Sequence, residues 1–214
     1  MTIPTKPFPS PFLIGLLDVP RFPHAAWALM PAVLSFADAL LLRHKLATPN
    51  ELFQVARRVR HMVPDTPLWI NGPLEVALAI DAEGWHLPAG QMPASAVRAH
   101  WSRMLSAAAH TLEEARWHQG ADILIWGHAF VTRSKPNTPP RHGLDTIIDG
   151  SVKPVAAIGG ITPTTAPQLS GRGLQGVVVA DGLWMAADPV NAAYRIRHAI
   201  DSPGWPDDVR RKET

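Results

Sequence analysis

The sequence predicts a single-domain α/β protein of the (β/α)8 TIM-barrel class. Its 214 residues suit one such barrel, and the 46% hydrophobic and 18% charged residues allow a sizeable core. Short apolar runs alternate with helical patterns, which indicates parallel βαβ units. About eight such units in this length fit a compact barrel. The alternative is an open doubly wound sheet, which is disfavoured because no GxGxxG motif follows the first apolar run.

Eight apolar runs supply the expected strands, of which the fifth is the weakest. Most of them end in polar residues or glycine. Active sites in this barrel class lie at the C-terminal ends of the strands, so we expect a site where these runs stop. The expected strands cover residues 11–17, 37–45, 67–72, 83–88, 103–110, 121–128, 153–160 and 174–182.

Four segments between the apolar runs have helical patterns. Thr48 followed by Glu51 forms a capping-box pattern, and Thr111 followed by Glu114 forms another. Asp188 is the expected N-cap of the last helix. The expected helices cover residues 48–62, 111–120, 162–173 and 188–200.

The rest of the chain divides into a barrel and two flanking segments. We expect a proline-rich N-terminal segment over 1–11, the barrel over 12–201 and a tail over 202–214. The proline-rich and polar segment 134–145 is an expected mobile loop over the active face.

Composition narrows the class of protein further. The chain has no cysteine, so it has no disulfide and no thiolate metal site. A net charge of +2 without a basic block gives no indication of nucleic-acid binding. The sequence shows no signal-peptide pattern and no membrane span, and we expect a cytoplasmic protein.

The end of the seventh apolar run has the pattern of an anion site. Gly159 and Gly160 lie between the run and a Thr-Pro helix start. Exposed glycine N–H groups beside a helix start can bind phosphate. The alternative is that the two glycines only permit a tight turn. His86, alone at the end of the fourth run, is expected to be a hydrogen-bonded structural histidine.

Seven stretches in order resemble the thiamine phosphate synthase/TenI family, from about residue 35 to residue 195. They are similar to family motifs such as QLREK, DGVHLG and GADYVxFGPVFxTxSK. The stretches are LLRHK (41–45), LWINGPLEVALA (68–79), EGWHL (83–87), AHTLEEA (109–115), GADILIWGHAFVTRSK (120–135), PVAAIGGITP (154–163) and LQGVVVADGLWMAADP (174–189).

The resemblance implies one of two activities. The synthase joins a pyrimidine diphosphate to a thiazole phosphate and releases pyrophosphate, with Mg²⁺ held by two aspartates that here align with Gly72 and Gln91. The TenI-like branch isomerises a carboxythiazole phosphate to its aromatic tautomer and has a histidine at the position of His128. We therefore expect a TenI-like thiazole tautomerase, an isomerase with His128 as acid/base, no metal site and no cofactor. Mg²⁺ is expected as a cofactor only if the protein has residual synthase activity.

The same resemblance implies a set of binding residues. Glycines after the last two strands would hold the substrate phosphate, and basic side chains would attract it. Asp181 replaces a family serine, so it must turn away or pair with a cation if a phosphate binds nearby. The implied binding residues are Arg43, Lys45, Asn71, Thr132, Lys135, Gly159, Gly160, Asp181 and Gly182.

Two alternatives stay open beside the tautomerase. One is a thiamine phosphate synthase, although both of its metal-binding aspartates are replaced here. The other is a non-catalytic member that binds a phosphorylated ligand. The expected partner is a small-molecule thiazole phosphate, and the resemblance suggests a homodimer.

Overall fold

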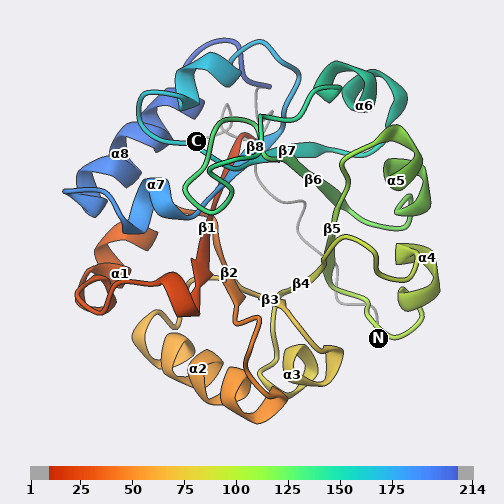
Figure 1. The fold of residues 1–214 in the computed structure, drawn as a ribbon. Helices are drawn as coiled ribbons and strands as arrows, with labels where there is room; N and C mark the ends of the chain where they lie inside the picture. The colour runs from red at the N-terminus through yellow and green to blue at the C-terminus, as the bar shows by residue number, and fades with distance from the viewer. Residues whose placement is uncertain (1–9, 207–214) are drawn as a thin grey trace, which may run out of the picture.

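The computed structural model describes residues 10–206, which form a closed barrel of eight parallel strands in sequence order (Figure 1). The predicted TIM barrel is confirmed. Each strand pairs with its neighbours in the chain, and the first pairs with the last. The strands are β1 Phe12–Asp18, β2 Ala39–Arg43, β3 Leu68–Asn71, β4 Gly84–Leu87, β5 Met104–Ala108, β6 Ile123–Gly127, β7 Val155–Ile158 and β8 Gly176–Val179.

Alternation along the strands separates two apolar clusters. One fills the barrel and includes Phe12, Ile14 and Trp69. The other packs the outer faces of the strands against the helices. Since side chains alternate between the two faces of a strand, the inward set continues past the apolar layers to Asp18 on β1 and Arg43 on β2. The apolar core therefore ends at the C-terminal ends of the strands, where Asp18 and Arg43 begin the polar rim of the barrel.

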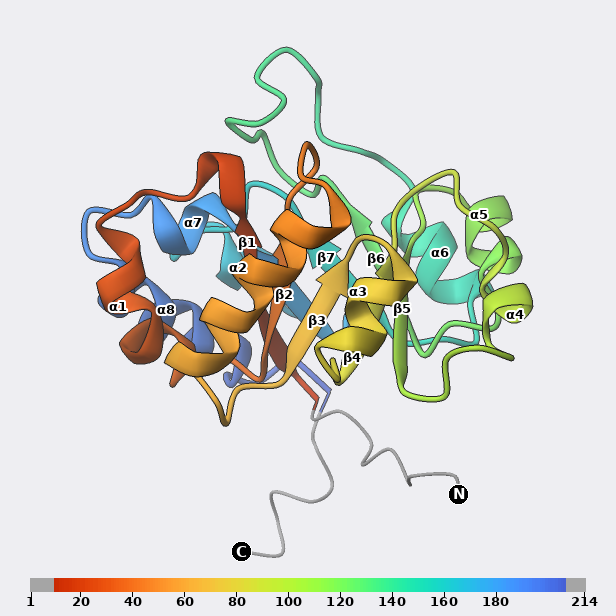
Figure 2. The same cartoon turned by 90° about the horizontal axis from the view of Figure 1, so that it is seen from below.

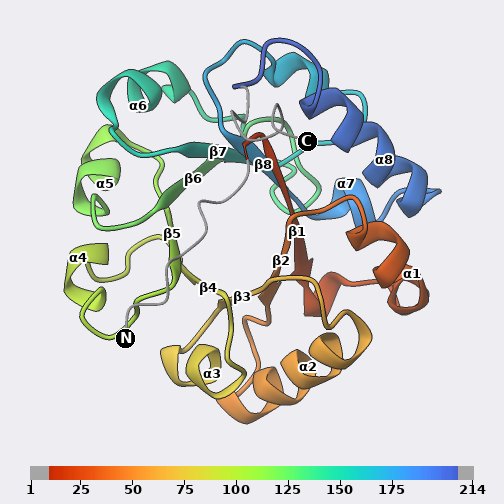
Figure 3. The same cartoon turned by 180° about the vertical axis from the view of Figure 1, so that it is seen from behind.

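Helices surround the barrel on its outside, as the two end views show (Figures 1 and 3). The predicted capping box of α2 is present, because the Thr48 side chain accepts from the Glu51 amide and the Glu51 carboxylate accepts from Thr48. The helices are α1 Ala26–Leu34, α2 Pro49–Met62, α3 Leu74–Ala79, α4 Ala94–Val97, α5 Leu112–Trp117, α6 Leu144–Gly150, α7 Asp181–Trp184 and α8 Pro189–Ile200, with the 3-10 turns η1 Val19–Arg21 and η2 Ala166–Leu169.

Two local predictions differ from the structure. The helix expected over 162–173 is only the 3-10 turn η2, because Pro167 lacks an amide hydrogen and Gly171 adopts a left-handed conformation with φ of 73°. At α5, Thr111 caps the helix, but the Glu114 carboxylate accepts from the amide of His110 rather than completing the box.

The loop between β6 and α6 rises above the C-terminal ends of the strands (Figure 2). Its tip is a tight turn in which the Lys135 amide donates to the Thr132 carbonyl at 3.0 Å. It ends at Gly143, which has φ of 90° before α6 begins. The segment expected over 134–145 therefore does cover the face where the site was predicted.

Two further expectations concern the ends of the chain and membranes. Most of the expected N-terminal segment and tail falls on residues 1–9 and 207–214, which lie outside the described residues. Within residues 10–206, none of the helices combines the length and the apolar character that a membrane span needs.

Candidate active site

A cavity of about 760 Å³ lies at the C-terminal ends of the strands, below the β6–α6 loop. Its volume is within the range of small-molecule sites. Asn71 is the one predicted site residue that does not line it, although it pairs in register with Arg43. The structure brings the other predicted residues together around the cavity: Arg43, Lys45, His128, Thr132, Lys135, Gly159, Gly160, Asp181 and Gly182.

The loops after β6, β7 and β8 approach so closely that only glycine fits between them. A Cβ atom on Gly160 would lie 2.4 Å from the Val131 carbonyl oxygen, and one on Gly182 would lie 1.9 Å from that of Ile161. Gly160 also has φ of 67°, a left-handed conformation that other residues rarely adopt. Tight packing alone therefore requires these glycines, and their proposed phosphate contacts remain a prediction.

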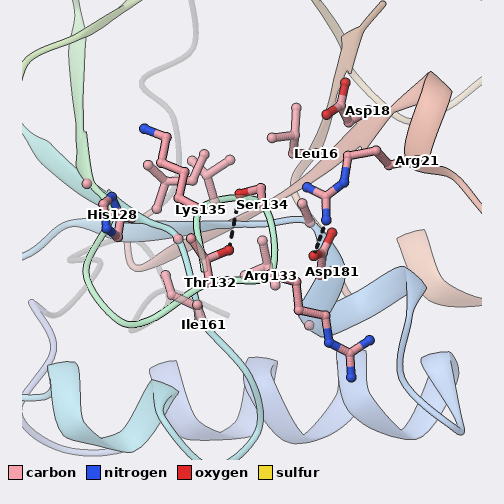
Figure 4. Close-up of a pocket in the computed structure, with 18 of the residues that line it drawn as sticks. Leu16, Asp18, Arg21, His128, Thr132, Arg133, Ser134, Lys135, Ile161 and Asp181 are labelled. Carbon is pink, nitrogen blue, oxygen red and sulfur yellow. Dashed lines mark hydrogen bonds and ion pairs between the residues drawn. The ribbon is translucent and has the colours of Figure 1, made fainter. Parts of the chain in front are cut away.

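Asp181 pairs with a cation that the sequence analysis did not single out. The Arg21 Nη2 atom lies 2.6 Å from the Asp181 Oδ2 atom, across the seam between β1 and β8 (Figure 4). The pairing resolves the conflict between Asp181 and a nearby phosphate, because the arginine offsets the carboxylate charge. The signal for Arg21 was its place just after the first apolar run, in LLDVPR.

The cavity carries an excess of positive charge. Among its lining residues the carboxylates are Asp18 and Asp181, and Asp18 lies 3.7 Å from the Arg43 Nε atom. Five cationic side chains line the same cavity: Arg21, Arg43, Lys45, Arg133 and Lys135. Within residues 10–206, no ion-pair partner contacts Lys45, Arg133 or Lys135, so the cavity suits an anion.

His128 stands in the wall of the cavity rather than at an open rim. It is 5% exposed, and its Nε2 atom lies 3.3 Å from the Thr138 carbonyl oxygen. Figure 4 shows it on the side of the cavity opposite the Arg21–Asp181 pair. Its Nδ1 atom is buried and has no hydrogen-bond partner among the described residues.

A second histidine, His110, lines the cavity next to His128 and was not predicted as a site residue. Burial lowers the pKa of His110, and the charges of Arg141 and Lys135 lower it further, against the opposing effect of Glu114. His110 is therefore neutral at pH values around 7. Its position at the end of β5, within AHTLEEA, was the available signal.

His86 has the structural role expected from the sequence. Its side chain lies inside the barrel, and its Nδ1 atom is 2.9 Å from the Ser106 hydroxyl. Burial, with Arg43 and His118 nearby, lowers the pKa of His86 from 6.5 to about 3. The imidazole therefore stays neutral and takes no proton from a substrate near neutral pH.

The residues that line the cavity do not fit a Mg²⁺ site of the family type. Mg²⁺ prefers carboxylate oxygens, but the aligned positions are Gly72 and Gln91. A Cβ atom on Gly72 would lie 2.6 Å from a terminal methyl group of Leu52, so that side chain would have to shift to admit a larger residue. The carboxylates that do line the cavity are each engaged by an arginine. Within residues 10–206, no cluster of three or more histidine and acidic side chains could hold a metal ion.

Comparisons with known proteins agree with the geometry of the barrel and its rim. Residues 25–183 match the family TMP-TENI, described as thiamine monophosphate synthase. The chain belongs to the thiamine phosphate synthase/TenI family. It is 34% identical over 173 residues to the thiamine-phosphate synthase of Moorella thermoacetica, covering 77% of this chain and 82% of that one. Against the thiamine-phosphate synthase of Chloroflexus aurantiacus the identity is 35%, with 80% and 82% covered.

Solved structures show the same relationship. The thiamine phosphate pyrophosphorylase of Pyrococcus furiosus superposes with a TM-score of 0.76 at 26% identity, over 89% of this chain and 95% of that one. A 3-hexulose-6-phosphate synthase, at 22% identity and a TM-score of 0.67, shares the fold alone.

These relatives overturn the tautomerase prediction. Relatives that share 30–36% identity over most of the chain are named thiamine-phosphate synthase, a transferase, and not an isomerase. The predicted function and enzyme class are therefore wrong, and the TenI-like branch has no specific support. The error came from giving three positions, Gly72, Gln91 and His128, more weight than the rest of the chain.

Proposed function

We propose that this protein is a thiamine-phosphate synthase, a transferase that joins a pyrimidine diphosphate to a thiazole phosphate. The observation that carries the proposal is the cavity at the barrel mouth, where five cations face two carboxylates that are both engaged by arginines. Both substrates are phosphorylated, so this excess of positive charge suits them. The names of the relatives support the same reaction.

The reaction breaks one bond and forms another. The bond between the pyrimidine methylene carbon and the diphosphate oxygen breaks, and the electron pair leaves with pyrophosphate. The ring nitrogen of the thiazole then forms the new carbon–nitrogen bond. Because negative charge builds up on the leaving oxygen, cations fixed around the diphosphate lower the barrier.

Several of the predicted residues take a role in this proposal. The amides of Gly160 and Gly182 would hold the thiazole phosphate at the β7 and β8 ends, where the Arg21–Asp181 pair lies alongside. Thr132, in the tip of the β6–α6 loop, would add a hydroxyl contact. Lys135 in the same turn would bring its ammonium group to the diphosphate when the loop closes over the substrates.

The test is product formation by the purified protein. Thiamine phosphate made from the two substrates is measured by oxidation to its fluorescent thiochrome derivative. Lys135→Gln should lower kcat/KM by about tenfold or more, equivalent to about 1.4 kcal/mol or more. Lys153→Gln is the matched control, because Lys153 precedes β7 at the opposite end of the barrel. If neither substrate is converted although both bind, the protein is a non-catalytic member that binds phosphorylated ligands.

Two finer points belong to the proposal. A small molecule is the expected partner, and the homodimer suggested by the family resemblance is tested by the mass of the purified protein in solution. Gly72 and Gln91 distinguish this protein from the family pattern, which has aspartates at both positions.

A further inference from the structure

We infer that the barrel mouth binds a diphosphate group without a divalent cation, through the side chains of Arg43, Lys45 and Lys135. The inference rests on the proposed function in one respect, which is that the ligand of this site is a phosphorylated substrate. It adds a property that the names of the relatives do not state: the charge of the diphosphate is balanced by the protein itself.

Positive charge is concentrated at the barrel mouth. The whole 214-residue chain has a formal net charge of +2. The residues that line the cavity include five cationic side chains and two carboxylates, an excess of three positive charges. The mouth thus carries more positive charge than the entire chain, and the remainder of the chain is slightly acidic. Such a concentration in one concave region attracts a multiply charged anion.

The carboxylates that line the cavity already form ion pairs with arginines. Asp181 lies 2.6 Å from Arg21, and Asp18 lies 3.7 Å from Arg43. A cation that recruited Asp181 would have to displace a close, charge-assisted contact and leave the guanidinium uncompensated. A metal ion therefore binds here only if it breaks these existing ion pairs.

The rim above β3 and β4, where the family aspartates would lie, has neutral residues at both positions. The carbonyl oxygen of Gly72 accepts a hydrogen bond of 2.9 Å from the Trp85 indole, so this oxygen has a partner. The carbonyl oxygen of Gln91 accepts one of 3.2 Å from the exposed side chain of Trp117. Neither residue has an anionic oxygen, and a hard dication binds neutral amide oxygens less well than carboxylates.

The three cations come from two different parts of the barrel mouth. Arg43 ends β2, and Lys45 follows it two residues later, so both come from one side of the mouth. Lys135 comes from the loop after β6 that crosses the mouth, and Figure 4 shows its side chain on the His128 side of the cavity. Arginine can bind two phosphate oxygens at once, and each lysine adds a compact charge. Cations from β2 and from the loop can thus hold a diphosphate between them.

The test uses inorganic pyrophosphate as the probe and isothermal titration calorimetry as the measurement. The full-length protein is titrated once in the presence of EDTA and once with excess Mg²⁺. The inference predicts saturable binding in EDTA, with a dissociation constant no more than about threefold higher than with Mg²⁺. A tenfold or greater gain in affinity with Mg²⁺, or no binding in EDTA, overturns it.

Variants identify the groups that hold the anion. Lys45→Gln and Lys135→Gln change exposed side chains without ion-pair partners among the described residues, so neither should disturb folding. Each should weaken metal-free binding by about five- to tenfold, and together they should reduce the dependence of binding on salt concentration. Lys153→Gln is the control and should leave binding unchanged. Equal affinity of the double variant and the original protein contradicts the inference.

The outcomes separate this inference from the proposed function. If thiamine phosphate is formed but pyrophosphate binds only with Mg²⁺, the synthase assignment stands and the metal-independent site is wrong. If pyrophosphate binds in EDTA and no thiamine phosphate is formed, the site is as inferred and the transferase assignment is wrong.

Discussion

Replacing Arg21 with alanine should weaken phosphate binding by removing the charge that balances Asp181. The two side chains lie 2.6 Å apart at the edge of the cavity, close to the glycines proposed to hold the phosphate. Without Arg21, a bound phosphate would be near a carboxylate with no compensating cation. The variant therefore tests whether the pair keeps the β8 end of the mouth suitable for an anion.

The size of the effect follows from Coulomb's law and the exposure of the pair. Two unit charges 4 Å apart interact by about 1 kcal/mol in water and by about 4 kcal/mol near a protein surface. The Arg21 side chain is 34% exposed and that of Asp181 22% exposed, so solvent screens much of this energy. We expect a loss of about 1–2 kcal/mol, or roughly five- to thirtyfold weaker binding.

The assay is calorimetric titration with inorganic phosphate of the original protein, Arg21→Ala, Asp181→Asn and the double variant. If Arg21 acts by compensating Asp181, the double variant should bind within about twofold of the original protein, because neither charge is present. A double variant as weak as Arg21→Ala would refute this reasoning and show that Arg21 contacts the phosphate directly. Arg172→Ala is the matched control, because its pair with Asp145 lies outside the cavity.

Two further predictions concern stability. The pKa of His86 is about 3 when folded and 6.5 as its ordinary value, so the unfolded chain takes up a proton first as the pH falls. As the pH falls from about 7 to about 5, protonation of this histidine in the unfolded chain should lower the free energy of unfolding by about 2 kcal/mol, measured by urea denaturation. His86→Gln should remove this part of the pH dependence of the unfolding free energy. An unchanged pH dependence in the variant contradicts the low pKa. Gly182→Ala places a Cβ atom 1.9 Å from the Ile161 carbonyl oxygen, so it should destabilise the protein by about 1–3 kcal/mol and lower Tm by roughly 2–4 °C per kcal/mol. A Tm within about 1 °C of the original protein would show that the β7 and β8 loops are not packed as described.

The sequence predicted most of the barrel because its strands are continuous apolar runs with clear ends. Each of the eight strands in the structure falls within, or one residue beyond, the range expected for it. The helices were harder to predict. α2 and α8 have good N-cap residues and were found, whereas α1 has no side-chain cap, contains Pro31 and was missed. α3, α4 and α7 have four to six residues, too few to show a periodic pattern.

The candidate site was predictable where it depended on strand ends. Because parallel strands deliver their C-terminal residues to one end of a barrel, residues as distant as Arg43 and Gly182 could be placed together without coordinates. The pairing of Arg21 with Asp181 could not be predicted in this way. The two residues are 160 positions apart and meet only because β1 closes the barrel against β8. The burial of His128 was also beyond the sequence, since it depends on how the β6–α6 loop folds back over the ring.

The central claim is that the cationic mouth catalyses transfer between two phosphorylated substrates. The most direct measurement is a single-turnover experiment with the pyrimidine diphosphate and the thiazole phosphate, in which thiamine phosphate and released pyrophosphate are both quantified. Thiamine phosphate and pyrophosphate should appear together in equal amounts. Persistence of both substrates on the protein, with neither product formed, would contradict it.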